Sequence, residues 1–225
     1  MKLKWTVALL VSTVLASNTF GQMYRDGLHA GFVTGGDIRN EGFAFGYQAS
    51  REINDFLLLA VSVTRQDDEL EGHIDEVPIP ADFSYNLETY AIAASAQLGF
   101  LLYDRVRLYA LAGAGFYVMD ADGEEVRETI AASPPSPVRL AGVSVDVDND
   151  FGLHVGAGIE IELSERWSVF VDYRHVMLEP DADLEIVEQR PTDRRGAVYE
   201  RTLTEVSDTL EYEHDLVHAG FNYWF

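Results

Sequence analysis

The sequence predicts an all-β protein, an eight-stranded antiparallel up-and-down transmembrane β-barrel. Three observations carry this prediction: an export leader at the start of the chain, strands in which apolar residues occupy every second position, and gaps between strands that alternate between short and long. An alternating strand has one apolar and one polar face, and closing the sheet into a barrel leaves no edge unpaired.

The first 21 residues are predicted to be a secretory signal peptide. Lys2 and Lys4 precede the apolar run at residues 5–16, and small residues follow as cleavage sites after positions 16 to 21. The apolar run is too short to cross a bilayer as a helix. We therefore expect residues 22–225 to form one barrel domain, which has no cysteine for a disulfide or a lipid anchor.

The clearest alternation lies in residues 150–163, DFGLHVGAGIEIEL, where seven apolar residues alternate with glycine, histidine and glutamate. The same pattern resumes after the turn at residues 164–166. Applied along the chain, this template predicts eight strands, near residues 26–35, 41–53, 56–66, 87–101, 105–118, 150–163, 166–178 and 211–225.

The gaps between these strands differ in length in a regular way. Asn54-Asp55, Tyr103-Asp104 and residues 164–166 read as tight turns, whereas residues 67–86, 119–149 and 179–210 read as long loops. Short turns on one rim and long loops on the other are typical of an outer-membrane barrel, with the short turns in the periplasm.

Side-chain size indicates which face points outward. A narrow eight-stranded lumen suits the face built from Gly, Ala, Ser and a few charges, so the apolar face is predicted to meet lipid. The predicted lumen network comprises His154, Glu160, Glu162, Asp172 and Arg174, and the predicted interfacial aromatics are Tyr47, Tyr90, Trp167 and Tyr173. The alternative is a soluble secreted barrel or sandwich with the apolar face inside.

Charge narrows the range of partners. The chain carries 38 acidic against 16 basic residues, a net charge of −22, which argues against binding nucleic acid. Much of the acid lies in the three long gaps, where divalent cations could bridge carboxylates to lipopolysaccharide phosphates. The segment DVDND at 146–150 lacks the glycine and terminal glutamate of an EF-hand, so a solvated acidic surface is the simpler interpretation.

The segments LYALAGAGFYV (108–118) and FGLHVGAGIEIELSERWSVFVDYRHV (151–176) resemble the outer-membrane β-barrel domain superfamily, which includes OmpA's membrane domain, OmpX, the Opa proteins and OmpW. The C-terminus resembles the barrel assembly signal of that superfamily through His218, Gly220, Tyr223 and Phe225. The resemblance implies an outer-membrane location, contact with membrane lipid and lipopolysaccharide, and recognition by the barrel assembly machinery. It implies no cofactor.

An enzymatic role is not expected. Charges in a narrow lumen are better explained as ion pairs than as catalytic groups. The segment YRHVML (173–178) is similar to part of the motif of lipid A deacylases such as PagL, but Met177 and Leu178 stand where the serine and asparagine should be. We expect a non-enzymatic surface or membrane-integrity protein; the alternatives are a narrow passive channel for small or apolar solutes, as in OmpW, and the deacylase.

Overall fold

The computed structural model describes residues 24–35, 38–74, 81–126, 130–131, 138–191, 199–209 and 212–225. The predicted signal peptide lies outside these residues, as does most of the proline-rich stretch near residue 135. No helix within the described ranges is long and apolar enough to cross a membrane.

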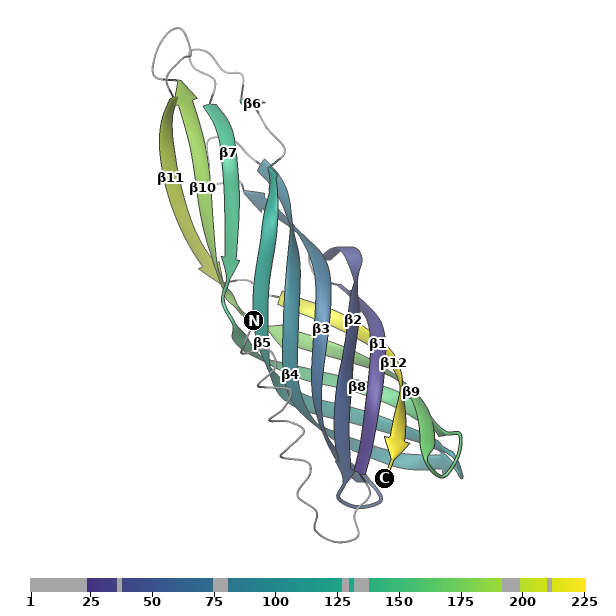
Figure 1. The fold of residues 1–225 in the computed structure, drawn as a ribbon. Coiled ribbons are helices and arrows are strands. Elements are labelled where there is room, and N and C mark those ends of the chain that lie inside the picture. Colours follow the sequence, from purple (N-terminus) through teal and green to yellow (C-terminus); the bar gives the residue numbers. More distant parts are fainter. Residues whose placement is uncertain are drawn as a thin grey trace.

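Eight antiparallel strands form a closed barrel, which confirms the predicted fold (Figure 1). Around the wall the order is β1-β12-β9-β8-β5-β4-β3-β2, so the last strand pairs with the first. The barrel strands are β1 (Tyr24–Thr34), β2 (Ile38–Glu52), β3 (Leu57–Ile74), β4 (Ala81–Tyr103), β5 (Val106–Val126), β8 (Asp150–Glu162), β9 (Trp167–Leu178) and β12 (Tyr212–Trp224).

The two ends of the barrel differ. At one end, here called the turn end, residues 53–56, 104–105 and 163–166 connect neighbouring strands. The described termini also meet there, because the Phe225 amide donates a hydrogen bond to the Tyr24 carbonyl at 3.0 Å. The opposite end, here called the extended end, carries the longer connections. The predicted tight turns at one end are therefore confirmed, whereas at the extended end only three residues separate β1 from β2.

Side chains alternate between lumen and outer wall as predicted. In β8, Phe151, Leu153 and Val155 are exposed on the wall, whereas His154 and Glu160 are buried inside. In β9, Phe170 points inward and is only 3 % exposed, although it interrupts the polar face of its strand. The lumen therefore accepts one large aromatic ring among its polar groups.

The outer wall has an apolar belt that begins at the turn end. On β3 the belt includes Leu57, Leu59, Val61 and Val63, and it ends at Arg65 and Asp67. Residues 57–65 match the 9–11 residues that a tilted strand needs to cross a bilayer. The strand nevertheless continues to Ile74, so its remaining residues project beyond the belt.

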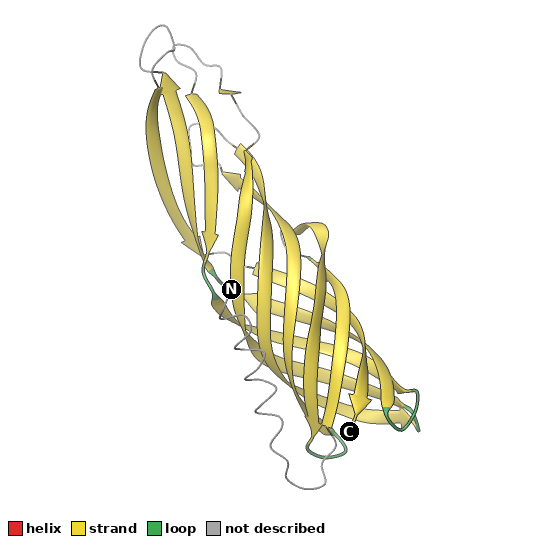
Figure 2. Ribbon diagram, in the orientation of Figure 1, coloured by secondary structure: helices red, strands yellow, loops and turns green. Residues whose placement is uncertain are grey.

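The prediction that residues 67–86, 119–149 and 179–210 are loops is wrong for much of these segments. β3, β4 and β5 extend into them, and a second sheet follows, ordered β11-β10-β7-β6 (Figure 2). Its strands are β6 (Ile130–Ala131), β7 (Val138–Val147), β10 (Asp181–Pro191) and β11 (Tyr199–Thr209). Backbone pairing satisfies polar groups in acidic strands as well as in apolar ones, so acidic composition did not prevent strand formation.

Candidate functional site

The lumen holds a polar cluster near the turn end, centred on Glu160 of β8. Its carboxylate accepts hydrogen bonds from Arg25 Nη1 at 2.6 Å, from Ser168 Oγ at 2.6 Å and from Asn222 Nδ2 at 3.0 Å. Arg25 also pairs with Glu52. These five residues, the turn-end cluster, come from five different strands, and their contacts cross the lumen.

Further side chains surround the turn-end cluster. Gln48 Nε2 donates to Asn222 Oδ1 at 2.9 Å, and Arg107 Nη1 lies 3.6 Å from Glu52 Oε1. The Arg25 guanidinium carbon lies 3.4 Å from the centroid of the Trp224 ring, a cation–π contact. Positive and negative groups are therefore interleaved, as a buried ionic cluster requires.

A second polar group, here called the central cluster, contains Asp172, Arg174, Tyr109 and His218. Arg174 binds Asp172 through Nε at 3.0 Å and Nη2 at 3.1 Å, which is a bidentate pair. Tyr109 donates its hydroxyl hydrogen to Asp172 Oδ2 at 3.2 Å, and His218 Nδ1 lies 3.4 Å from Asp172 Oδ1. Bidentate geometry and extra hydrogen bonds offset the cost of burying the two charges.

Two more histidines face the lumen beside this cluster. His29 Nε2 lies 3.0 Å from Thr64 Oγ1, and His154 Nε2 lies 2.8 Å from Ser95 Oγ. The rings of His29 and His218 are 4.7 Å apart. The first two contacts each reach past one intervening strand, from β1 to β3 and from β8 to β4, and the ring contact joins the neighbouring strands β1 and β12.

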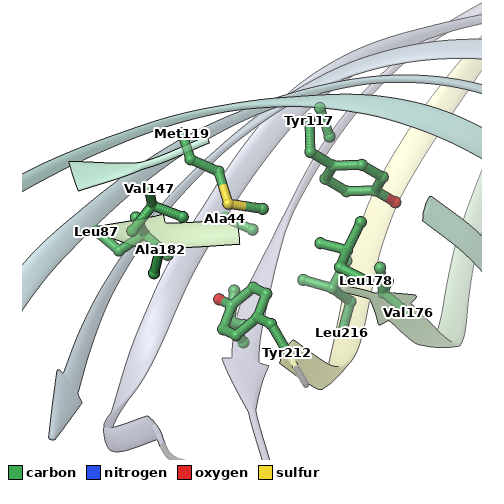
Figure 3. Close-up of a cluster of buried hydrophobic side chains, with 12 residues drawn as sticks. Ala44, Leu87, Tyr117, Met119, Val147, Val176, Leu178, Ala182, Tyr212 and Leu216 are labelled. Carbon is green, nitrogen blue, oxygen red and sulfur yellow. The ribbon is translucent and has the colours of Figure 1, made fainter. Parts of the chain in front are cut away.

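Toward the extended end, the lumen is filled by apolar side chains, here called the apolar cap (Figure 3). Tyr117, Leu178 and Leu216 lie within it, each no more than 4 % exposed. The Tyr212 hydroxyl crosses to β3 and donates to Asp68 Oδ2 at 2.9 Å. The full cap comprises Val33, Ala44, Leu87, Ala91, Tyr117, Met119, Val147, Val176, Leu178, Ala182, Tyr212 and Leu216.

Glycine makes room for the larger lumen groups. A Cβ at Gly158 would lie 2.7 Å from the Asp172 Cβ and would also collide with the Tyr109 ring. A Cβ at Gly220 would lie 2.7 Å from two ring carbons of Phe170. The small face seen in the sequence is thus filled by side chains from neighbouring strands.

The structure divides the five residues of the predicted lumen network. Asp172 and Arg174 meet in the central cluster, Glu160 belongs to the turn-end cluster, and His154 pairs with Ser95. Glu162 is half-buried at the end of β8, and within the described residues its side chain makes no hydrogen bond to the other four.

The predicted interfacial aromatics all lie on the outer face of the barrel. Trp167 is 45 % exposed at the turn end, where its ring lies 4.9 Å from that of Tyr223. Tyr90 pairs in register with Arg65 at the other limit of the belt, and Tyr47 pairs with Val63 within it. Tyr173 donates its hydroxyl hydrogen to Asp215 Oδ1 at 2.6 Å.

The four residues of the predicted assembly signal lie on both faces of β12 and at its end. His218 faces the central cluster and Gly220 adjoins Phe170, whereas Phe225 is 74 % exposed. Tyr223 packs edge-on against Phe225 with ring centroids 5.0 Å apart. Recognition of this segment by the assembly machinery stays a prediction.

His175 is surrounded by carboxylates. Its Nδ1 lies 2.9 Å from Asp215 Oδ1 and its Nε2 lies 4.0 Å from Glu213 Oε2. In the described part of the chain no serine or threonine hydroxyl hydrogen-bonds to His175, so an activated nucleophile is missing there. Nor do the described residues bring together three or more groups able to hold a metal ion.

The sequence prediction missed several lumen groups. Arg25, Ser168 and Asn222 belong to the turn-end cluster, and Gln48 contacts it. A signal for Arg25 existed, because Leu28, Ala30 and Phe32 are the outward positions of β1 and position 25 has the opposite parity. Which inward groups meet across the lumen depends on register, which the sequence does not specify.

Comparisons with known proteins agree with this geometry. Residues 6–225 match the family model described as outer membrane protein beta-barrel domain. Neisserial surface protein A aligns with a TM-score of 0.53 and 17 % identity, covering 92 % of this chain and 100 % of that one. OprG of Pseudomonas aeruginosa aligns with a TM-score of 0.55 and 10 % identity, covering 92 % and 97 %.

A major outer membrane protein of Thermus thermophilus is similar at a TM-score of 0.53 and 14 % identity, covering 92 % of this chain and 100 % of that one. At such identities the likeness concerns the fold. Comparison with curated proteins gives no match. Because the family match spans nearly the whole chain, this protein belongs to the outer membrane protein β-barrel domain family and is an integral β-barrel protein of the outer membrane.

Proposed function

We propose that this protein is a non-enzymatic surface protein whose closed barrel anchors an acidic β-structure that acts outside the cell. The observation that carries the proposal is the filled lumen. A water-filled channel would leave lumen side chains exposed, yet Thr89 and Ser168 are 0 % exposed and Asp172 is 2 % exposed. The barrel is therefore better suited to anchoring than to transport.

The extended end supports the second part of the proposal. β4 has 23 residues and β5 has 21, whereas a tilted strand needs about 9–11 to cross the bilayer. At about 3.3 Å per residue, the surplus of roughly ten residues projects about 30 Å along each strand. Hydrogen-bonded strands hold their shape better than isolated loops, so this end offers a preformed surface.

The charge of this end indicates the kind of partner. Residues 67–86 contain seven acidic residues and no arginine, and residues 179–209 contain nine acidic residues and four arginines. Such a surface attracts cationic groups and divalent ions, and it repels bare phosphates. We propose contacts with cationic environmental partners directly and with lipopolysaccharide phosphates through divalent cations.

Two other functions fit the geometry less well. A passive channel would require the apolar cap and both polar clusters to move aside, and the many cross-lumen hydrogen bonds oppose this. A lipid A deacylase would require a nucleophile beside His175, whose described partners are carboxylates.

Two measurements test the proposal. Purified full-length protein in planar bilayers should give no reproducible single-channel steps; steps in the unmodified protein would contradict a closed lumen. Because the chain has no cysteine, Asp183→Cys can report on the extended end and Glu165→Cys on the turn end, and both positions are exposed. A membrane-impermeant maleimide should label the first variant on intact cells and leave the second unlabelled; the reverse pattern would contradict the orientation.

A further inference from the structure

We propose that a groove on the outer wall, at the limit of the apolar belt, binds cationic amphiphiles, molecules that join an alkyl chain to an ammonium group. The groove has a volume of about 540 Å³, within the usual range for small-molecule sites. It lies over β8, β9 and the start of β12, and it is independent of the proposed role of the extended end. Its lining residues are Asp150, Phe151, Leu153, Met177, Leu178, Glu179 and Glu213.

The floor of the groove is apolar. Phe151 is 75 % exposed and Leu153 is 60 % exposed, both on the outer face of β8. The Phe151 ring is supported from beside by Phe116 of β5, with ring centroids 4.8 Å apart. An alkyl chain lying along β8 would therefore bury apolar surface on both itself and the wall.

The rim of the groove is acidic. Two backbone hydrogen bonds hold Asp150 in place. Its Oδ1 accepts one from the Phe151 amide at 2.6 Å, and its Oδ2 accepts one from the Glu179 amide at 3.2 Å. Glu179 is exposed, and the Glu213 side chain is 62 % exposed. No arginine or lysine is among the described residues that line the groove.

His175 lies beside the rim, and its ring is already engaged. Its Nδ1 lies 2.9 Å from Asp215 Oδ1, whereas its Nε2 lies 4.0 Å from Glu213 Oε2. Tyr173 also donates to Asp215, which fixes that carboxylate on the side of His175 away from the groove. The groove lining thus holds three carboxylates, and the histidine beside it is already paired with Asp215.

These features together match one chemical class. An ammonium group is attracted to carboxylates and to the face of an aromatic ring, and Asp150 and Phe151 both line the groove. The adjoining apolar belt takes the alkyl chain. An anionic amphiphile would place its charge against the same carboxylates and be repelled, and a neutral one would gain only the apolar contact.

The test uses the full chain in nanodiscs of zwitterionic lipid and three probes that share an eight-carbon chain: octyltrimethylammonium, octyl sulfate and octyl glucoside. Titration calorimetry should give the ammonium probe an affinity about tenfold above that of the glucoside, with the sulfate weakest. Glu179→Gln combined with Glu213→Gln should reduce the affinity for the ammonium probe to that for the glucoside. Both substitutions keep the side-chain shape.

A matched control replaces an acidic pair elsewhere on the outer face, Asp67→Asn with Glu88→Gln, and should leave ammonium binding unchanged. An equal loss in this control would show a diffuse charge effect and would overturn the site. Equal affinity for all three probes would overturn it too. Tighter binding of octyl sulfate with Mg²⁺, lost in the Glu179 and Glu213 double variant, would replace the proposal with a cation-bridged anion site. A heat-shifted gel band checks that each variant is folded.

Discussion

Replacing Glu160 with glutamine should weaken the turn-end cluster more than any other conservative change in the lumen. In the native protein Glu160 Oε2 accepts from Arg25, while Oε1 accepts from Ser168 and Asn222. A glutamine of the same shape has one carbonyl oxygen and one amide NH2 group. Whichever way the amide turns, its NH2 group faces a donor, either Arg25 or Asn222. The buried arginine also loses half of its compensating charge.

The expected size of the effect follows from the remaining contacts. Removing one partner of a buried ion pair costs about 3–5 kcal/mol. Arg25 keeps its pairing with Glu52 and its contact with the Trp224 ring, so the lower end of that range, about 3 kcal/mol, applies here. Glu165→Gln in the exposed turn at residues 163–166 should change stability by less than about 0.5 kcal/mol.

Urea unfolding of protein folded into lipid vesicles measures this difference, with tryptophan fluorescence as the signal. Trp224 contacts Arg25 and reports on the cluster directly, whereas Trp167 lies on the outer face at the turn end. The double variant Arg25→Met with Glu160→Leu should recover most of the loss, because it removes both charges together. Equal stability of Glu160→Gln and native protein would refute the reasoning, as would a double variant less stable than Glu160→Gln.

Other changes should act through close packing, buried hydrogen bonding and assembly. Gly158→Ala should destabilise the barrel by about 1–3 kcal/mol in the same urea assay, because the added Cβ collides with the Tyr109 ring. Ser95→Ala should cost about 1–3 kcal/mol by leaving a ring nitrogen of His154 buried without its partner, whereas Ser95→Thr should cost less. Deleting Phe225 should lower the amount of protein assembled in the outer membrane more than the amount exported; equal losses in cell fractionation would count against the assembly signal.

The barrel could be predicted from the sequence because its physical constraints are local and periodic. Alternation in residues 150–163 settles which side chains share a face, and small residues on one face settle which face is inside. The extended end could not be predicted in this way, since acidic residues and prolines resemble loop composition. A signal was present, because Val143, Val145 and Val147 alternate within β7, yet its long partner strand, β10, lies far along the chain.

In the candidate sites, too, the sequence predicts which way a side chain points but not which residues it meets. That Glu160 and Asp172 point inward follows from parity, but their partners follow from the closure of the barrel. Arg25 and Glu160 are 135 positions apart and meet because β1 and β8 face each other across a narrow lumen. The outer groove depends on Glu213 of β12 approaching β8 and β9, which alternation alone does not reveal.

The depth of the central cluster bears on where this protein can interact. Asp172 and Arg174 are charged groups of the kind that active sites use. The turn-end cluster covers them on one side, however, and the apolar cap covers them on the other. A substrate could reach them only by breaking contacts that link opposite walls, and buried ion pairs lose much of their compensation when opened. Chemistry directed at other molecules is therefore left to surfaces that water or lipid already touches. The extended end and the acidic groove on the outer wall are such surfaces, and cationic partners are what we propose for both.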